Sequence, residues 1–239
     1  MALFRPAHQR LTRAVGRVHN SFRKEDEKHM TKQRLIWISP VLVVLISTIS
    51  IRVAASFIGV WAWLPWILIY WAIIGGLAIW AGGKESIQRW MKPAEGHWLW
   101  SVLAVILGLS GITMFVSSWQ LLAPLYILIP WLILGIVNPF LEEWYWRGLM
   151  LDMTQSWPVW VRVLYASAFF SLNHLLGIGV TSIGSRHPIF LINTFVLGVI
   201  FSIIYLKTKS LRWLIVGHAL ADLLGLSILV FLNLWVPPV

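Results

Sequence analysis

The chain has 239 residues, of which 59% are hydrophobic and only 12% are charged. Soluble domains average about 25% charged residues, so this composition excludes an ordinary soluble protein. Apolar stretches long enough to cross a bilayer recur through most of the chain, and we expect residues 35–239 to form a single transmembrane domain. The sequence contains no cysteine, which excludes disulfide bonds, iron–sulfur clusters and thiol catalysis.

Residues 1–34 form a basic segment ahead of the first apolar stretch. Nine of the 19 Lys and Arg residues fall in it, within a chain whose net charge is +10. The positive-inside rule places such a segment in the cytoplasm, beside anionic lipid headgroups. We therefore predict a cytoplasmic N-terminal tail on a multi-pass protein of the cell membrane. Membrane lipids, and not nucleic acid, are its expected partners.

About seven apolar stretches, each near the length that spans a bilayer, predict an all-α helical bundle. They cover Leu35–Val60, Leu64–Ala81, Trp98–Phe115, Leu121–Trp146, Val159–Ile178, Ile189–Leu206 and Trp213–Trp235. A hairpin within the first stretch would raise the number to about eight. Lys and Arg collect in alternate connections, which supports this count and a cytoplasmic N-terminus.

Five ionisable residues fall within these stretches, where a charge costs several kcal/mol and so marks a candidate functional site. They are Glu142 and Glu143 in the fourth stretch, His174 in the fifth, and His218 with Asp222 in the seventh. A lone histidine in a membrane helix usually packs through one hydrogen bond. Five such groups on three helices favour a shared site instead.

The spacing of these residues suggests different roles for them. Glu143 and Arg147 are four residues apart and therefore neighbours on a helix, which predicts a structural ion pair. Adjacent residues on a helix diverge by about 100°, so Glu142 is left without that partner and is the candidate general base. His218 and Asp222 are also four residues apart. Such a pair can orient the imidazole ring or bind a metal.

The depth of these residues in the membrane is uneven. If Arg147, Arg162 and Arg212 mark the inner interface, Glu142 lies about 7 Å deep and His174 about 18 Å deep. This spread is wide for one site. Helix tilt, a kink at Pro139, or a fifth helix that begins outside the lipid would bring the groups together.

In these residues the chain resembles the CPBP family of membrane proteases, which includes type II CAAX prenyl endopeptidases and bacteriocin-processing or immunity proteins. The family pattern is Glu-Glu-x-x-x-Arg, then Phe-x-x-x-His, then His-x-x-x-Asn or a similar polar residue. The matching residues are Glu142, Glu143 and Arg147, then Phe170 and His174, then His218 and Asp222. The resemblance covers about residues 121–230.

The resemblance implies an endopeptidase that cleaves a membrane-associated protein or peptide, prenylated ones included. Because Glu142 lies near the inner interface when Arg147 marks it, we expect the cleavage near the cytoplasmic face. The resemblance also implies that Glu142 and His174 activate a water molecule, that His218 stabilises the oxyanion, and that no cofactor is needed. Asp222 departs from the usual Asn, and an ionised carboxylate cannot donate a hydrogen bond to an oxyanion. We expect Asp222 to orient His218 instead.

Three alternatives stay open at this point. Glu142, His174, His218 and Asp222 would also make a set of four zinc ligands, although the His-Glu-x-x-His motif is absent. We favour the metal-free route. A non-catalytic scaffold, immunity or regulatory protein would retain the same fold. A proton-coupled transporter would use the same carboxylates, but no internal repeat is evident.

Overall fold

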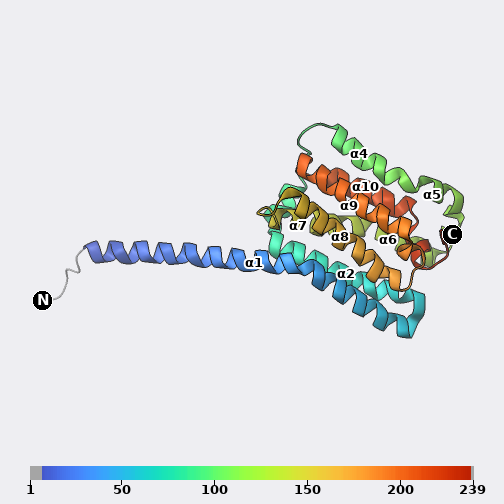
Figure 1. Cartoon of the computed structure of the whole chain (residues 1–239), viewed down its shortest axis with the longest axis horizontal. Coiled ribbons are helices and arrows are strands. Elements are labelled where there is room, and N and C mark those ends of the chain that lie inside the picture. Colours follow the sequence, from blue (N-terminus) through green and yellow to red (C-terminus); the bar gives the residue numbers. More distant parts are fainter. Residues whose placement is uncertain (1–6, 238–239) are drawn as a thin grey trace.

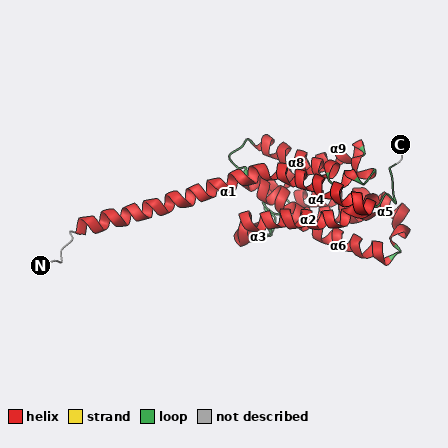
Figure 2. Cartoon of the chain, turned by 90° about the horizontal axis from the view of Figure 1, so that it is seen from below, coloured by secondary structure: helices red, strands yellow, loops and turns green. Residues whose placement is uncertain are grey.

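The computed structural model describes residues 7–237, with side chains described from Met30 onward. No strand occurs in that range, which confirms the all-α prediction (Figure 2). Residues 1–6 of the predicted tail lie outside the described range, and residues 7–29 are described only as helix backbone. The cytoplasmic position of the tail therefore stays a prediction.

The helices pack as one bundle, which Figure 1 shows from the side. They are α1 (Ala7–Ile58), α2 (Trp63–Leu77), α3 (Gly83–Trp90), α4 (Leu99–Gly108), α5 (Ile112–Ser118), α6 (Leu125–Glu142), α7 (Met150–Met153), α8 (Val159–Leu176), α9 (Pro188–Thr208), α10 (Arg212–Leu224) and α11 (Ser227–Phe231). A π-helical segment, Glu143–Leu149, joins α6 to α7.

Five helical stretches among the described residues are long and apolar enough to cross a membrane. They are Met30–Trp90, Leu99–Leu122, Leu125–Met153, Val159–Val180 and Pro188–Thr208. The first stretch contains a hairpin of α1 and α2, because the chain reverses at Gly59 (Figure 1). The φ of Gly59 is 57°, a left-handed conformation that favours glycine.

The seventh predicted span, Trp213–Trp235, was wrong as a single helix. The chain leaves the helical path after Leu224, and Leu226 adopts a left-handed φ of 50°. A short helix, α11, follows this turn and packs against α6. The apolar composition of the segment predicted burial in the bundle correctly, but it carried no signal for the break.

The centre of the bundle is α10, which packs on α4 through small residues. A Cβ atom on Gly217 would fall on the carbonyl oxygen of Ala104, and one on Gly108 would fall on the carbonyl oxygen of Gly217. The two backbones are therefore in direct contact, as small residues permit in membrane helix pairs. This contact fixes the position of His218, the next residue after Gly217.

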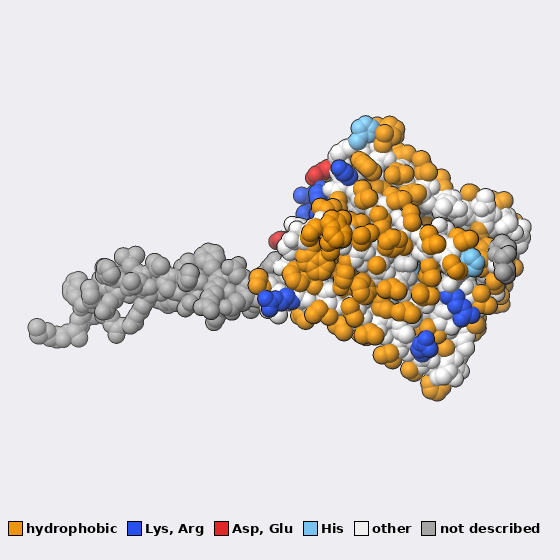
Figure 3. Space-filling model, in the orientation of Figure 1, with side chains coloured by type: hydrophobic (Ala, Val, Ile, Leu, Met, Phe, Trp, Pro, Cys, Tyr) orange, Lys and Arg blue, Asp and Glu red, His pale blue; other side chains and the backbone are white. Residues whose placement is uncertain are grey.

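Large apolar side chains face outward over most of the bundle. Phe57 is 82% exposed, Trp160 68% and Leu125 66%. Figure 3 shows hydrophobic side chains across the middle of one face, with charged side chains toward its ends. An apolar exterior of this extent suits lipid and not water. The molecule is an integral membrane protein.

Lys and Arg gather at one end of the bundle, here called the basic end. Hydrogen bonds hold its parts together: Gln33 binds the end of α7, Arg89 pairs with Asp152 at 2.8 Å, and the Ser210 hydroxyl donates to the carbonyl of Lys92 at 2.6 Å. The cations from Met30 onward at this end are Lys32, Arg34, Lys84, Arg89, Lys92, Arg162, Lys207, Lys209 and Arg212.

The opposite end is tied by a second set of hydrogen bonds. Ser182 donates to the carbonyl of Val230 at 2.7 Å, and the Asn233 amide donates to the carbonyl of Thr181 at 2.8 Å. The cations that this end contributes within residues 30–237 are Arg52 and Arg186. The two ends therefore differ strongly in charge.

The contact between α4 and α10 predicts the effect of adding one methyl group. Gly217→Ala should lower the free energy of unfolding by about 1–3 kcal/mol, because its Cβ would overlap backbone atoms of Ala104 that cannot move alone. The matched control is Gly76→Ala on α2, where nothing lies within 4 Å of the added Cβ. Unfolding in mixed detergent micelles, followed by tryptophan fluorescence, measures both. Equal losses in the two variants would contradict the close packing.

Candidate active site

His218 lies at the centre of a buried polar cluster. Its Nδ1 atom is 2.7 Å from Oε1 of Glu143, and its Nε2 atom is 3.3 Å from Oε2 of Glu142. Carboxylates accept hydrogen bonds, so an imidazole that carries hydrogens on both nitrogens satisfies both sides. The structure therefore holds this ring between two carboxylates from adjacent positions of the chain.

The contact that orients His218 comes from Glu143. We expected Asp222 in that role, but its Oδ1 atom lies 3.7 Å from Nε2, beyond hydrogen-bond distance. The predicted pair of Glu143 with Arg147 is present at 3.0 Å. The Oε1 atom of Glu143 thus accepts hydrogen bonds from both the guanidinium of Arg147 and the imidazole of His218.

The local backbone explains how two adjacent glutamates reach one ring. Glu142 is the last residue of α6, and Glu143 begins the π-helical segment, so the helix widens between them. Helix α6 itself continues through Pro139 without a break. π-helical turns of this kind occur often at functional sites. Here the π-helical turn places the carboxylate of Glu143 beside Nδ1 of His218 and that of Glu142 beside Nε2.

Arg147 is buried and not at the membrane interface. It is 1% exposed, and its guanidinium lies 4.3 Å from the centre of the Phe170 ring. Depths counted from Arg147 were therefore wrong. Asp152 lies at the basic end, ten residues after Glu142, which puts Glu142 about 15 Å deep. The uneven depths expected from the sequence do not separate the groups, because Glu142 meets His218 directly.

Two residues that the sequence did not indicate hold Glu142 in place. The Tyr70 hydroxyl on α2 donates to Oε1 at 2.7 Å, and the Asn138 amide on α6 donates to Oε2 at 3.0 Å. The Trp146 indole N–H donates to the Tyr70 oxygen at 2.8 Å, which leaves the tyrosine O–H for Glu142. A lone tyrosine in the apolar stretch of α2 was the available signal, because a buried hydroxyl needs a partner.

Asn138 also connects the two outer carboxylates of the cluster. Its Nδ2 atom lies 3.1 Å from Oδ2 of Asp222 as well as 3.0 Å from Glu142. Its Oδ1 atom accepts from the indole N–H of Trp71 at 2.9 Å. Because an indole N–H only donates, this bond fixes the orientation of the amide. Asn138 lies four residues before Glu142, a spacing that places both on one face of α6.

His174 has one free ring nitrogen. Its Nδ1 atom lies 2.9 Å from the carbonyl oxygen of Phe170, which accepts only, so Nδ1 is the donor. Nε2 is then an acceptor. The Phe170 ring contacts both imidazoles, with centroid distances of 4.8 Å to His174 and 6.1 Å to His218. Phe170 therefore spaces the two histidines apart.

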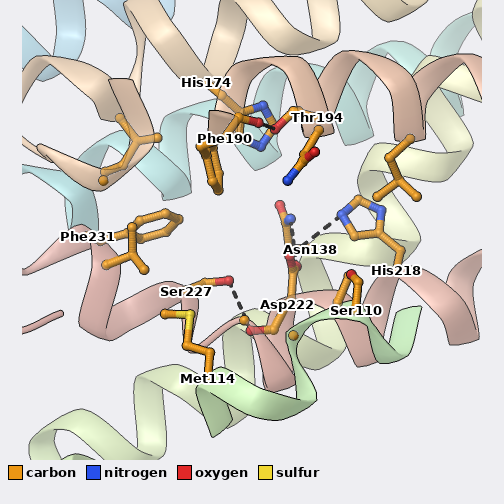
Figure 4. Close-up of a pocket in the computed structure, with 18 of the residues that line it drawn as sticks. Ser110, Met114, Asn138, His174, Phe190, Thr194, His218, Asp222, Ser227 and Phe231 are labelled. Carbon is orange, nitrogen blue, oxygen red and sulfur yellow. Dashed lines mark hydrogen bonds and ion pairs between the residues drawn. The ribbon is translucent and has the colours of Figure 1, made fainter. Parts of the chain in front are cut away.

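A cavity of about 620 Å³ brings the four candidate residues together. Glu142, His174, His218 and Asp222 all line it, and Figure 4 shows the two histidines, Asn138 and Asp222 around one space. Apolar side chains cover most of the remaining wall. A volume of this size accommodates several residues of an extended peptide.

The polar cluster does not fit a zinc site. No group of three or more Asp, Glu and His side chains in the described part of the chain is arranged to hold a metal ion. Both nitrogens of His218 face carboxylates, and Nδ1 of His174 faces a backbone carbonyl. The absence of a cofactor stays a prediction.

An apolar helical bundle with paired carboxylates and imidazoles inside it defines an integral membrane protein with a buried polar site. Residues 123–224 match the family model described as type II CAAX prenyl endopeptidase Rce1-like. The match covers a little under half of the chain, and it supports the membership of the CPBP family that the three motifs predicted. This is a protease family, which supports peptidase activity in general. No curated protein and no solved structure matches the chain.

The buried ion pair of Arg147 predicts a large effect on stability. Arg147→Met should lower the free energy of unfolding by about 3–5 kcal/mol, because it leaves the Glu143 charge buried without its guanidinium. The matched control is Arg89→Met, whose side chain is 53% exposed beside Asp152 and which should cost less than about 1 kcal/mol.

Unfolding in mixed micelles measures both variants. Adding Glu143→Gln to Arg147→Met should recover part of the loss, because the buried carboxylate that has lost its guanidinium is then replaced by a neutral amide. Equal losses for the two single arginine variants would show that burial does not set the strength of the Arg147 pair.

Proposed function

We propose that the protein is an intramembrane endopeptidase that hydrolyses a peptide bond of a membrane-associated protein or peptide. One observation carries this proposal: Glu142, His174 and His218 line a single cavity inside a bundle of apolar helices. Such a cavity holds a peptide bond, a water molecule and the groups that move protons between them. Its largely apolar wall suits a peptide with apolar or lipid-modified residues near the cleaved bond.

The water molecule is activated between Glu142 and His174. Nε2 of His174 accepts a hydrogen bond from the water, and Glu142 takes one of its protons as the oxygen attacks the peptide carbonyl carbon. Tyr70 and Asn138 hold the Glu142 carboxylate, so the base does not need to reorient during the step.

His218 stabilises the negative charge that forms on the carbonyl oxygen. Its Nε2 side faces the cavity, and Glu143 fixes the ring from behind through Nδ1. A hydrogen bond from Nε2 to the oxyanion replaces its contact with Glu142. The proton taken by Glu142 then passes to the amide nitrogen, the C–N bond breaks, and a carboxylic acid and an amine leave.

Glu142→Gln should abolish cleavage, with a rate loss of at least about 100-fold, because the amide cannot take the proton from water. Comparative mass spectrometry of membrane peptides, from cells with the wild type and with Glu142→Gln, measures the loss and identifies the substrate. Glu95→Gln, an exposed residue at the basic end, is the control with the same change of side chain. His174→Ala and His218→Ala should lose the same products.

Normal peptide products in all three variants, with the proteins folded in the membrane, would contradict the proposed endopeptidase activity. That outcome would favour a scaffold or regulatory role for the same fold. If Glu142→Gln abolished a transport activity but removed no peptide product, a proton-coupled transporter would be favoured.

Tyr70→Phe should lower kcat about 10- to 100-fold and leave KM nearly unchanged. The reason is that a hydrogen bond to a charged group contributes about 1.5–3 kcal/mol, and this one acts on the base and not on the substrate. The control is Tyr126→Phe, because Tyr126 is 65% exposed at the bundle surface. Cleavage kinetics on the peptide found by mass spectrometry measure both. A rise in KM with unchanged kcat would place Tyr70 in substrate binding instead.

A further inference from the structure

The cavity leads from the candidate site to the end of the bundle opposite the basic end. Its walls continue past His174 to Gly184, His187, Val230, Phe231, Trp235 and Pro237. These residues belong to the connection before α9 and to the segment after α10. None of the lining residues is a lysine or an arginine, and none comes from the connections that form the basic end.

The site is closed toward the basic end by fully buried side chains. Arg147, Trp146 and Phe201 are each at most 1% exposed and lie beside the polar cluster. Trp90 is also 1% exposed, and it packs against Gly148 one residue beyond Arg147. A peptide has no path through this layer.

The walls of the cavity separate toward the opposite end. Helix α9 packs on α4, while α5 has no comparable contact with α9 among the described residues. Ser110, at the junction of α4 with α5, and Asn193 on α9 line the cavity and are both exposed. Polar side chains thus lie on both sides of the cavity mouth. Figure 4 shows Ser110 and Met114 on one wall and Phe190 with Thr194 on the other.

The charge of the two ends assigns the mouth to a side of the membrane. From Met30 onward, the basic end holds nine cations, and the opposite end holds Arg52 and Arg186. The positive-inside rule puts the end rich in Lys and Arg in the cytoplasm. The cavity mouth then faces away from the cytoplasm.

We propose that the substrate peptide enters between α5 and α9 from the non-cytoplasmic side and is cleaved on that side of the buried layer. This inference rests on the proposed endopeptidase function and adds the class of substrate, a peptide segment exposed on the outer side of the membrane. We expected cleavage near the cytoplasmic face because Arg147 was taken to lie at the inner interface. Arg147 instead belongs to the layer of buried side chains that closes the site toward the basic end.

The chain has no cysteine, so single cysteines can be introduced without removing others. Asn193→Cys places a thiol at the cavity mouth. Lys207→Cys, fourteen residues later on the same helix, is the matched control at the basic end. Both are exposed in the structure. A membrane-impermeant maleimide is applied to right-side-out vesicles and, separately, to inverted vesicles. Ser110→Cys provides a second probe of the mouth if Asn193→Cys does not fold.

We expect labelling of Asn193→Cys in right-side-out vesicles and of Lys207→Cys in inverted ones. Labelled Asn193→Cys should lose its cleavage activity relative to the same variant unlabelled, because the attached group fills the mouth. Labelled Lys207→Cys should keep its activity.

Three results would overturn the proposal. They are labelling of Asn193→Cys from the cytoplasmic side, its labelling only by a membrane-permeant maleimide, and full cleavage after complete labelling. Labelling needs no substrate, so the two proposals can fail separately. If Asn193→Cys is labelled from the outer side but no peptide product depends on Glu142, the results would support the entry route and contradict the proposed endopeptidase activity.

Discussion

Burial of ionised side chains away from water is the constraint on which the rest of this structure depends. Glu142, Glu143 and Arg147 are all at most 2% exposed inside a bundle whose exterior is apolar. An unpaired charge there would cost several kcal/mol, so each group needs a partner of fixed geometry. Those partners come from α2, α8 and α10 as well as from the glutamate helix. The polar cluster therefore sets the register of four helices at once.

The helix contact at Gly217 positions the side chain of the next residue, His218, in the polar cluster. The backbone contact of Gly217 with α4 brings α10 close enough for the next residue to reach both glutamates. A larger residue at position 217 would move the imidazole away from a hydrogen bond of 2.7 Å, where small displacements matter. The same close packing holds α4 on α10, one wall of the cavity. The geometry of the candidate site and the shape of the cavity thus depend on one helix crossing.

Composition and spacing were enough to predict the class of fold and to select four residues that line one cavity. Apolar length indicated the helical bundle, and the three motifs indicated the residues that line the cavity. Features that depend on contacts between distant helices were not predicted. Tyr70 is 72 residues before Glu142, and no local pattern links them. The turn at Leu226 was missed because its residues are as apolar as a helix interior. Arg147 was misplaced because a buried arginine and an interfacial one look alike in a single sequence.

Asp222 shows how a departure from a family motif can be balanced elsewhere in the fold. The family pattern usually has an amide four residues after the second histidine, and here that position carries a carboxylate. The structure supplies an amide from α6 instead, because Asn138 donates to both Asp222 and Glu142. Trp71 fixes its orientation, so the N–H groups point at the carboxylates. An amide on α6 thus takes the place of the amide that the family pattern has on the helix of the second histidine, and it donates to both carboxylates.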